Sequence, residues 1–190
     1  YLPLTEYSFS EENKAGRLFY GHCSVQKAAS MFFYHENSTI QQLIHGLKYR
    51  GIEKIGVDFG IWYGAMLSRE KGLPDIDYVL PVPLHRKKKR KRGYNQCTGF
   101  GRELARALKA DFSEALLVRR ESSPTQTSKS RWHRWKGTQG AFHAPYPLRL
   151  EGKRILLVDD VITTGATLGA CCEALSHIRH GGIYIAAMAM

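Results

Sequence analysis

The most constraining feature of the sequence is a strand–loop–helix pattern near its carboxyl end, from Ile155 to Thr167. Residues 155–158 form a continuous apolar run that predicts a buried strand. Asp159 and Asp160 follow, and then come two aliphatic residues and a Thr/Gly-rich loop that opens a helix. Ligands bind at the carboxyl ends of the strands in parallel α/β sheets, so the pattern predicts a binding site here.

The loop from Thr163 to Thr167 has the features of a phosphate cradle. A Thr/Gly loop before a helix exposes successive backbone N–H groups, and the helix N-terminus adds a positive dipole end. Carboxylates would repel a phosphate, so Asp159 and Asp160 suit hydroxyl donors such as a ribose 2′,3′ pair, with or without a metal. The alternative interpretation is an ordinary strand–loop–helix with capping threonines. The loop is not a P-loop, because no Lys follows Gly165.

Strand and helix patterns alternate along the rest of the chain. They predict an α/β fold with a mostly parallel sheet and helices on both faces. Strands are expected at 31–34, 78–83, 115–118, 154–158 and 183–188. Helices are expected from a Ser38 cap to Gly51, and over 52–66, 100–108 and 168–178. Residues 1–35 are predicted to be an irregular segment that packs on a core domain of residues 36–190.

Composition excludes several classes of protein. Hydrophobic residues make up 43% and charged residues 24% of the 190 residues, which excludes a disordered chain. No apolar run approaches the ~18 residues of a membrane span, so we expect no membrane insertion and a cytoplasmic location. The four cysteines have no CxxC spacing, so they are expected to be reduced and mostly buried.

The formal net charge is +11, which points to a polyanionic partner. The charge is concentrated in one block of seven cations, which we expect to be extended and solvated: Arg86, Lys87, Lys88, Lys89, Arg90, Lys91 and Arg92. A solvated surface explains any single one of these side chains. The block as a whole favours an anion, and we hypothesise that it binds single-stranded nucleic acid such as single-stranded DNA.

The stretch 155–167 resembles the signature of type I phosphoribosyltransferases, which bind 5-phosphoribosyl-1-pyrophosphate (PRPP). Further motifs narrow the resemblance to the competence protein F (ComF) family, and they follow the family order from about residue 16 to 190. These motifs are Leu47-Lys48-Tyr49-Arg50-Gly51, Leu80-Pro81-Val82-Pro83-Leu84-His85, Arg92-Gly93-Tyr94-Asn95-Gln96, Gln126-Thr127 with Ser130-Arg131, and Gly140-Ala141-Phe142.

The resemblance implies a type I phosphoribosyltransferase fold, with residues 36–190 as its domain, and a role for each motif. Asp159 and Asp160 would bind the ribose hydroxyls of Mg²⁺-bound PRPP, with no direct protein cluster for the metal. The 5′-phosphate would lie on Thr163, Thr164, Gly165, Ala166 and Thr167. The pyrophosphate loop would be Val82, Pro83, Leu84 and His85. A flexible catalytic loop over 126–140 would offer Lys129, Arg131, His133, Arg134 and Lys136.

The resemblance also bears on the acceptor. Members that act on 6-oxopurines carry an acid/base Asp where this chain has Thr163, so a hypoxanthine or guanine transferase is disfavoured. Family members usually begin with a four-cysteine zinc module that these 190 residues lack, so we expect either a fragment or a member that lost the module, and no zinc.

Two functional hypotheses follow from the resemblance. The first is phosphoribosyl transfer from PRPP to an unknown acceptor with release of pyrophosphate. The alternative is a nucleic-acid-binding factor for the uptake of transforming DNA, acting with other competence proteins, in which the PRPP site is a sensor or a relic. A regulator that binds PRPP or a nucleotide without turnover is a weaker third option.

Overall fold

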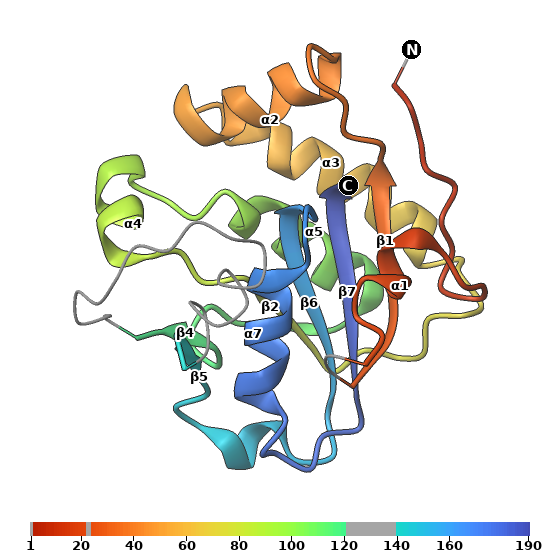
Figure 1. Cartoon of the computed structure of the whole chain (residues 1–190), viewed down its shortest axis with the longest axis vertical. Helices are drawn as coiled ribbons and strands as arrows, with labels where there is room; N and C mark the ends of the chain where they lie inside the picture. Colours follow the sequence, from red (N-terminus) through yellow and green to blue (C-terminus); the bar gives the residue numbers. More distant parts are fainter. Residues whose placement is uncertain (1, 22–23, 121–139) are drawn as a thin grey trace.

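The computed structural model describes residues 2–21, 24–120 and 140–190 (Figure 1). The main strands are β1 (Val25–Phe32), β2 (Tyr78–Pro81), β3 (Asp111–Phe112), β6 (Arg154–Val161) and β7 (Gly182–Ala189). The helices are α1 (Lys14–Arg17), α2 (Thr39–Tyr49), α3 (Lys54–Leu67), α4 (Arg86–Arg92), α5 (Cys97–Leu108) and α7 (Ala166–Leu175). A short antiparallel pair, β4 (Val118–Arg119) and β5 (Phe142–His143), precedes the 3₁₀ turn η1 (Pro147–Leu150).

The main sheet has the order β1-β7-β6-β2-β3, and every neighbouring pair in it is parallel. All carboxyl ends therefore meet at one edge. Helices α2 and α4 lie toward this edge, at the upper end of the view in Figure 1. The central strand β6 lies between β7 and β2, so the residues that end β6 are flanked on both sides.

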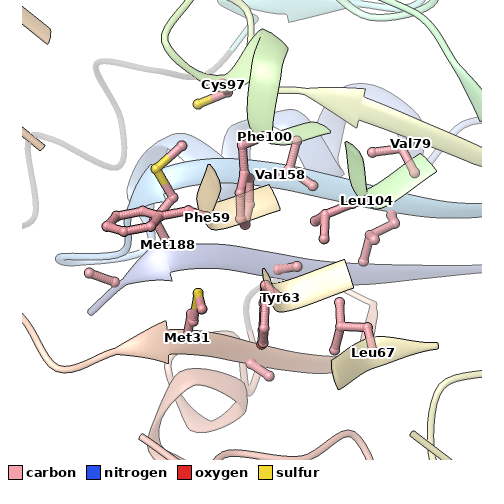
Figure 2. Close-up of a cluster of buried hydrophobic side chains, with 14 of the residues drawn as sticks. Met31, Phe59, Tyr63, Leu67, Val79, Cys97, Phe100, Leu104, Val158 and Met188 are labelled. Atoms are coloured by element: carbon pink, nitrogen blue, oxygen red, sulfur yellow. The ribbon is translucent and has the colours of Figure 1, made fainter. Parts of the chain in front are cut away.

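Two apolar layers cover the sheet, as the strand alternation requires. Leu156 and Val158 of β6 pack into a cluster with α2, α3 and α5, while Ile155 and Leu157 pack into a cluster with α1 and α7. Figure 2 shows the first cluster, with Val158 between residues of α3 and α5. Helices α3 and α5 approach each other so closely at Gly60 that a Cβ added there would lie 2.7 Å from Glu103 Cβ.

Most predicted elements are confirmed, with shifted bounds. The Ser38 hydroxyl caps α2 by accepting a hydrogen bond from Gln41 N at 3.1 Å. The first strand is Val25–Phe32 rather than 31–34, and it lies at the sheet edge within the segment 1–35. The proposed boundary at residue 35 stays a prediction. The strand expected at 115–118 is wrong for its first three residues, because only Val118 and Arg119 find a partner strand.

Candidate functional site

The acid pair lies within the last paired residues of β6 rather than after the strand, because β7 continues alongside it as far as Ala189. Both side chains are buried, Asp159 at 9% and Asp160 at 5% exposure. Asp160 N donates to Asp159 Oδ1 at 2.9 Å, and the Cys97 thiol lies 3.8 Å from the same oxygen. Lys48 Nζ lies 2.8 Å from Asp160 Oδ1.

These contacts shift the protonation of the site. Burial, and then the charge of Asp160, raise the pKa of Asp159 to about 7. Burial opposes the charge on Lys48, but the Asp160 carboxylate outweighs it and raises the pKa of the ammonium. Burial and the two carboxylates raise the pKa of Cys97, so its thiol stays protonated and can donate. The other Asp160 oxygen, Oδ2, is buried and has no partner among the described residues.

The predicted phosphate loop borders a small hollow that opens to solvent. Asp159 lines this hollow together with Val161, Ile162, Thr163, Thr164, Gly165, Ala166, Thr167 and Leu168. Gly165 has φ +74°, which the turn into α7 requires, and a Cβ there would lie 3.1 Å from Phe19 Cε1. An anion in the hollow would meet the N-terminal end of a ten-residue helix.

The second predicted loop, Val82 to His85, follows β2 and lies beside β6. Val82 N donates to Val158 O at 2.9 Å. The buried Asn95 side chain donates from Nδ2 to Val82 O at 3.0 Å and accepts from Cys97 N at 3.1 Å. Asn95 therefore ties this loop to the start of α5 and to the cysteine beside Asp159.

The basic block is helical, so the expectation of an extended segment is wrong. The His85 ring caps α4 by accepting from Lys87 N at 3.2 Å, and Gly93 ends the helix in a left-handed conformation. Two cations bind the helix to the body. Lys89 Nζ lies 2.9 Å from Glu114 Oε2, and the Arg92 guanidinium lies 5.6 Å from the centre of the Tyr49 ring and donates to Gln96.

Lys89 and Arg92 contact the body of the protein, and the opposite face of α4 is exposed to solvent. Lys87, Arg90 and Lys91 have i, i+3, i+4 spacing, are exposed, and lie on the side of the helix opposite Lys89 and Arg92. The structure thus gives the basic block both docking residues and an exposed cationic face.

Comparisons with known proteins show what this chain is similar to. A model of the phosphoribosyl transferase domain matches residues 95–187. The DNA utilization protein YhgH of Salmonella typhi is 29% identical over 142 residues, which cover 73% of this chain and 61% of that protein. Competence protein F of Haemophilus influenzae is 34% identical over 112 residues, 58% of this chain and 48% of that protein. The chain is thus similar to competence protein F and to the DNA utilization protein YhgH, and residues 95–187 match the phosphoribosyl transferase domain.

The fold of this chain is that of type I phosphoribosyltransferases. A glutamine PRPP amidotransferase from B. subtilis, solved with ADP and GMP, superposes with a TM-score of 0.50 at 18% identity. The match covers 76% of this chain and 30% of the amidotransferase. The chain spans about half to three fifths of the length of its curated relatives.

Several of the predicted site residues lie outside the described part of the chain. They are Lys129, Arg131, His133, Arg134 and Lys136 of the expected flexible loop, together with Trp132 and Trp135. Cys23 also lies outside it, whereas the thiols of Cys97, Cys171 and Cys172 are reduced and buried, as expected. Within the ranges that the structure describes, no helix is long and apolar enough to cross a bilayer.

Three residues of the site were not predicted, although all lie in or next to motifs that carried the resemblance. Lys48 belongs to the motif 47–51, Asn95 to the motif 92–96, and Cys97 follows directly. For each of the three, a place in or beside one of these motifs was the only signal in the sequence for a role in the site. Nothing local in the sequence indicates that Lys48 reaches Asp160.

Proposed function

We propose that this chain binds PRPP at the carboxyl edge of its sheet. The ribose hydroxyls bind Asp159 and Asp160, the 5′-phosphate binds the loop 163–167, and the pyrophosphate lies beside Val82 to His85. One observation carries the proposal: the buried acid pair, with an unpartnered oxygen on Asp160, adjoins through Asp159 a hollow lined by the loop before α7.

The chemistry of the two neighbouring subsites supports a sugar phosphate. Ionised carboxylates only accept hydrogen bonds, so the acid pair suits hydroxyl groups and repels phosphate. The backbone N–H groups at the start of α7 favour an anion. A ligand that satisfies both subsites carries adjacent hydroxyls and a phosphate a few bonds away, which describes a ribose 5-phosphate unit.

The side chains also fit Mg²⁺ carried by such a ligand. Ligand atoms of Cys97, Asp159 and Asp160 lie within 4.8 Å of one another. A thiol is a poor ligand for Mg²⁺, which is usually bound through one or two carboxylates plus substrate phosphates. The set therefore suits a metal that enters with the pyrophosphate, which would neutralise charge on the leaving group, and it does not suit an all-protein magnesium cage.

The proposal extends to phosphoribosyl transfer. A nucleophilic acceptor would form a bond to ribose C1 while the bond from C1 to the pyrophosphate oxygen breaks, and pyrophosphate would leave with the bonding electrons. Thr163 is exposed at the start of the loop, and its hydroxyl is too weak an acid for the acid/base role that Asp has in 6-oxopurine enzymes. We therefore expect an acceptor other than hypoxanthine or guanine.

Calorimetry tests the binding step. The wild type is expected to bind PRPP in a Mg²⁺-dependent way, and Asp160→Asn to weaken binding by at least ~1 kcal/mol, the scale of a charge-assisted hydrogen bond. Asp58→Asn is the control, because Asp58 is also ion-paired to a lysine but lies exposed on α3. A folded wild type that binds no PRPP would refute the proposal. Pyrophosphate release across a panel of bases and amines tests turnover.

A second partner is supported by the exposed cationic face of α4. The relatives are named for DNA utilization and for competence. We propose that Lys87, Arg90 and Lys91 bind the backbone of single-stranded nucleic acid without sequence preference. With ~0.7 counterions released per phosphate, three such contacts give a log–log salt slope of about −2.

Fluorescence anisotropy over a salt series tests this surface. The triple change Lys87→Ala, Arg90→Ala and Lys91→Ala should flatten the slope by roughly two units and weaken all sequences alike. Lys89 stays in place because it binds the helix to Glu114. The control removes three exposed cations elsewhere, Lys54, Lys71 and Arg106, for the same change in net charge. Equal effects of the two triple variants would assign the binding to net charge alone.

A further inference from the structure

Among the residues that the structure describes, Lys48 is the cation that contacts the acid pair. It comes from the last turn of α2, and its side chain is 21% exposed. Its ammonium lies 2.8 Å from Asp160 Oδ1, and the second oxygen of the same carboxylate is buried without a partner among the described residues. An ion pair to one carboxylate oxygen restricts the rotation of the carboxylate, and this sets the direction of the other oxygen.

Neighbouring contacts hold Lys48 in this position. The Tyr94 hydroxyl donates to the carbonyl of Leu47, and the Arg92 guanidinium lies over the ring of Tyr49. The residues on both sides of Lys48 are thus bound to the end of α4 and to the segment that follows it. The end of α2 therefore presents Lys48 to β6 from a fixed place.

The same contact lowers the negative charge of the site. With both side chains ionised, the acid pair carries charge −2, and a sugar phosphate would bring further negative charge to the hollow that Asp159 lines. Lys48 offsets one of the two carboxylate charges at short range, where burial makes the interaction strong.

Resting on the proposed function, we infer that Lys48 is a positioning residue for ribose recognition. It holds Asp160 through Oδ1 so that Oδ2 accepts a hydrogen bond from a ribose hydroxyl. Lys48 thereby makes the site select ribose phosphates over their deoxy analogues. The 5′-phosphate loop does not depend on this contact, so the two parts of the ligand respond differently to the loss of Lys48.

Calorimetry without Mg²⁺ tests this role, with ribose 5-phosphate and its 2-deoxy and 3-deoxy analogues as probes. The wild type should bind ribose 5-phosphate about tenfold or more tightly than at least one deoxy sugar, as expected for a hydrogen bond to a charged group. In Lys48→Met this ratio should fall to near one, while the affinity for that deoxy sugar changes less than about twofold. Lys48→Arg, which keeps the charge, should retain a measurable part of the selectivity.

Two further variants separate positioning from folding. Lys54→Met is the control, because Lys54 forms an equally short pair with Asp58 on the exposed face of α3; it should keep the wild-type ratio. The double variant Lys48→Met with Asp160→Asn removes both buried charges. If Lys48 acts through Asp160, the double variant should show the same selectivity as Asp160→Asn alone.

Each contrary outcome overturns the inference. An unchanged sugar ratio in Lys48→Met, tighter binding of ribose 5-phosphate by that variant, or a further loss in the double variant would each do so. A wild type that binds PRPP but treats all three sugars alike would also overturn it while leaving PRPP binding intact. A wild type that fails to bind PRPP refutes the proposed function instead.

Discussion

At the scale of single residues, the acid pair combines two opposite environments. Asp160 has an ammonium as its partner, whereas the partners of Asp159 are a thiol and a backbone N–H. Asp159 is therefore the carboxyl whose burial is least compensated, and its pKa rises to about 7. The site holds a carboxylate at a cost to stability, as expected where a ligand is to supply hydrogen-bond donors.

This pKa predicts a pH dependence of stability without ligand. Between an unfolded pKa of about 4 and the folded value of about 7, the folded state holds the proton and the unfolded state does not. The contribution of this carboxyl to the free energy of unfolding is therefore largest at low pH. It is lost as the pH rises through 7. Asp159→Asn, which keeps the acceptor oxygen, should raise the melting temperature more at pH 8 than at pH 5.

Thermal unfolding of the wild type and Asp159→Asn at the two pH values measures the effect, since the other titrating groups cancel in the difference. Asp58→Asn on the surface of α3 is the control. An equal shift at pH 5 and pH 8 would contradict a raised Asp159 pKa.

At the scale of elements, the turn from β6 into α7 performs two tasks. It reverses the chain from strand to helix, and it lines the hollow with backbone rather than with bulky side chains. Gly165 serves both, because its φ is +74° and Phe19 from the segment after α1 packs against it. The loop is thus held from behind by the N-terminal segment.

Gly165→Ala should destabilise the fold by about 1–2 kcal/mol through left-handed strain, with an added cost from the contact with Phe19. It should also weaken PRPP binding, because the loop must shift. Gly152→Ala is a matched control, since Gly152 has φ +68° but a Cβ added there would meet no atom within 4 Å. Chemical denaturation and calorimetry on both variants check this. Unaltered PRPP affinity in a folded Gly165→Ala variant would argue against a phosphate in this loop.

At the scale of the whole molecule, the parallel sheet gathers the site. The order β1-β7-β6-β2-β3 puts the ends of β2 and β6 side by side, so the loop 82–85 and the acid pair share one edge. Helix α2 reaches the same edge from a different part of the chain and contributes Lys48. The helical basic block joins it through Arg92 and Tyr49. Sugar, phosphate and nucleic-acid surfaces are thus proposed for neighbouring parts of one end of the molecule.

The sequence by itself determined the parts of this protein that depend on local chemistry. The apolar run at 155–158, the acids after it and the Thr/Gly loop predict a strand, a hydroxyl site and a phosphate site from neighbouring residues alone. The Ser38 cap and the i, i+3, i+4, i+7 stripe behind it likewise predict α2, because helix signals lie within a few residues of one another.

Only the tertiary structure decided which distant groups meet and how deeply they are buried. The pairing of Lys48 with Asp160, the place of Asn95 between two loops, and the division of the basic block by Glu114 and Tyr49 all join residues far apart in the chain. The raised pKa of Asp159 belongs here as well. Charge interactions and desolvation depend on distance and burial, and the folded sheet sets both.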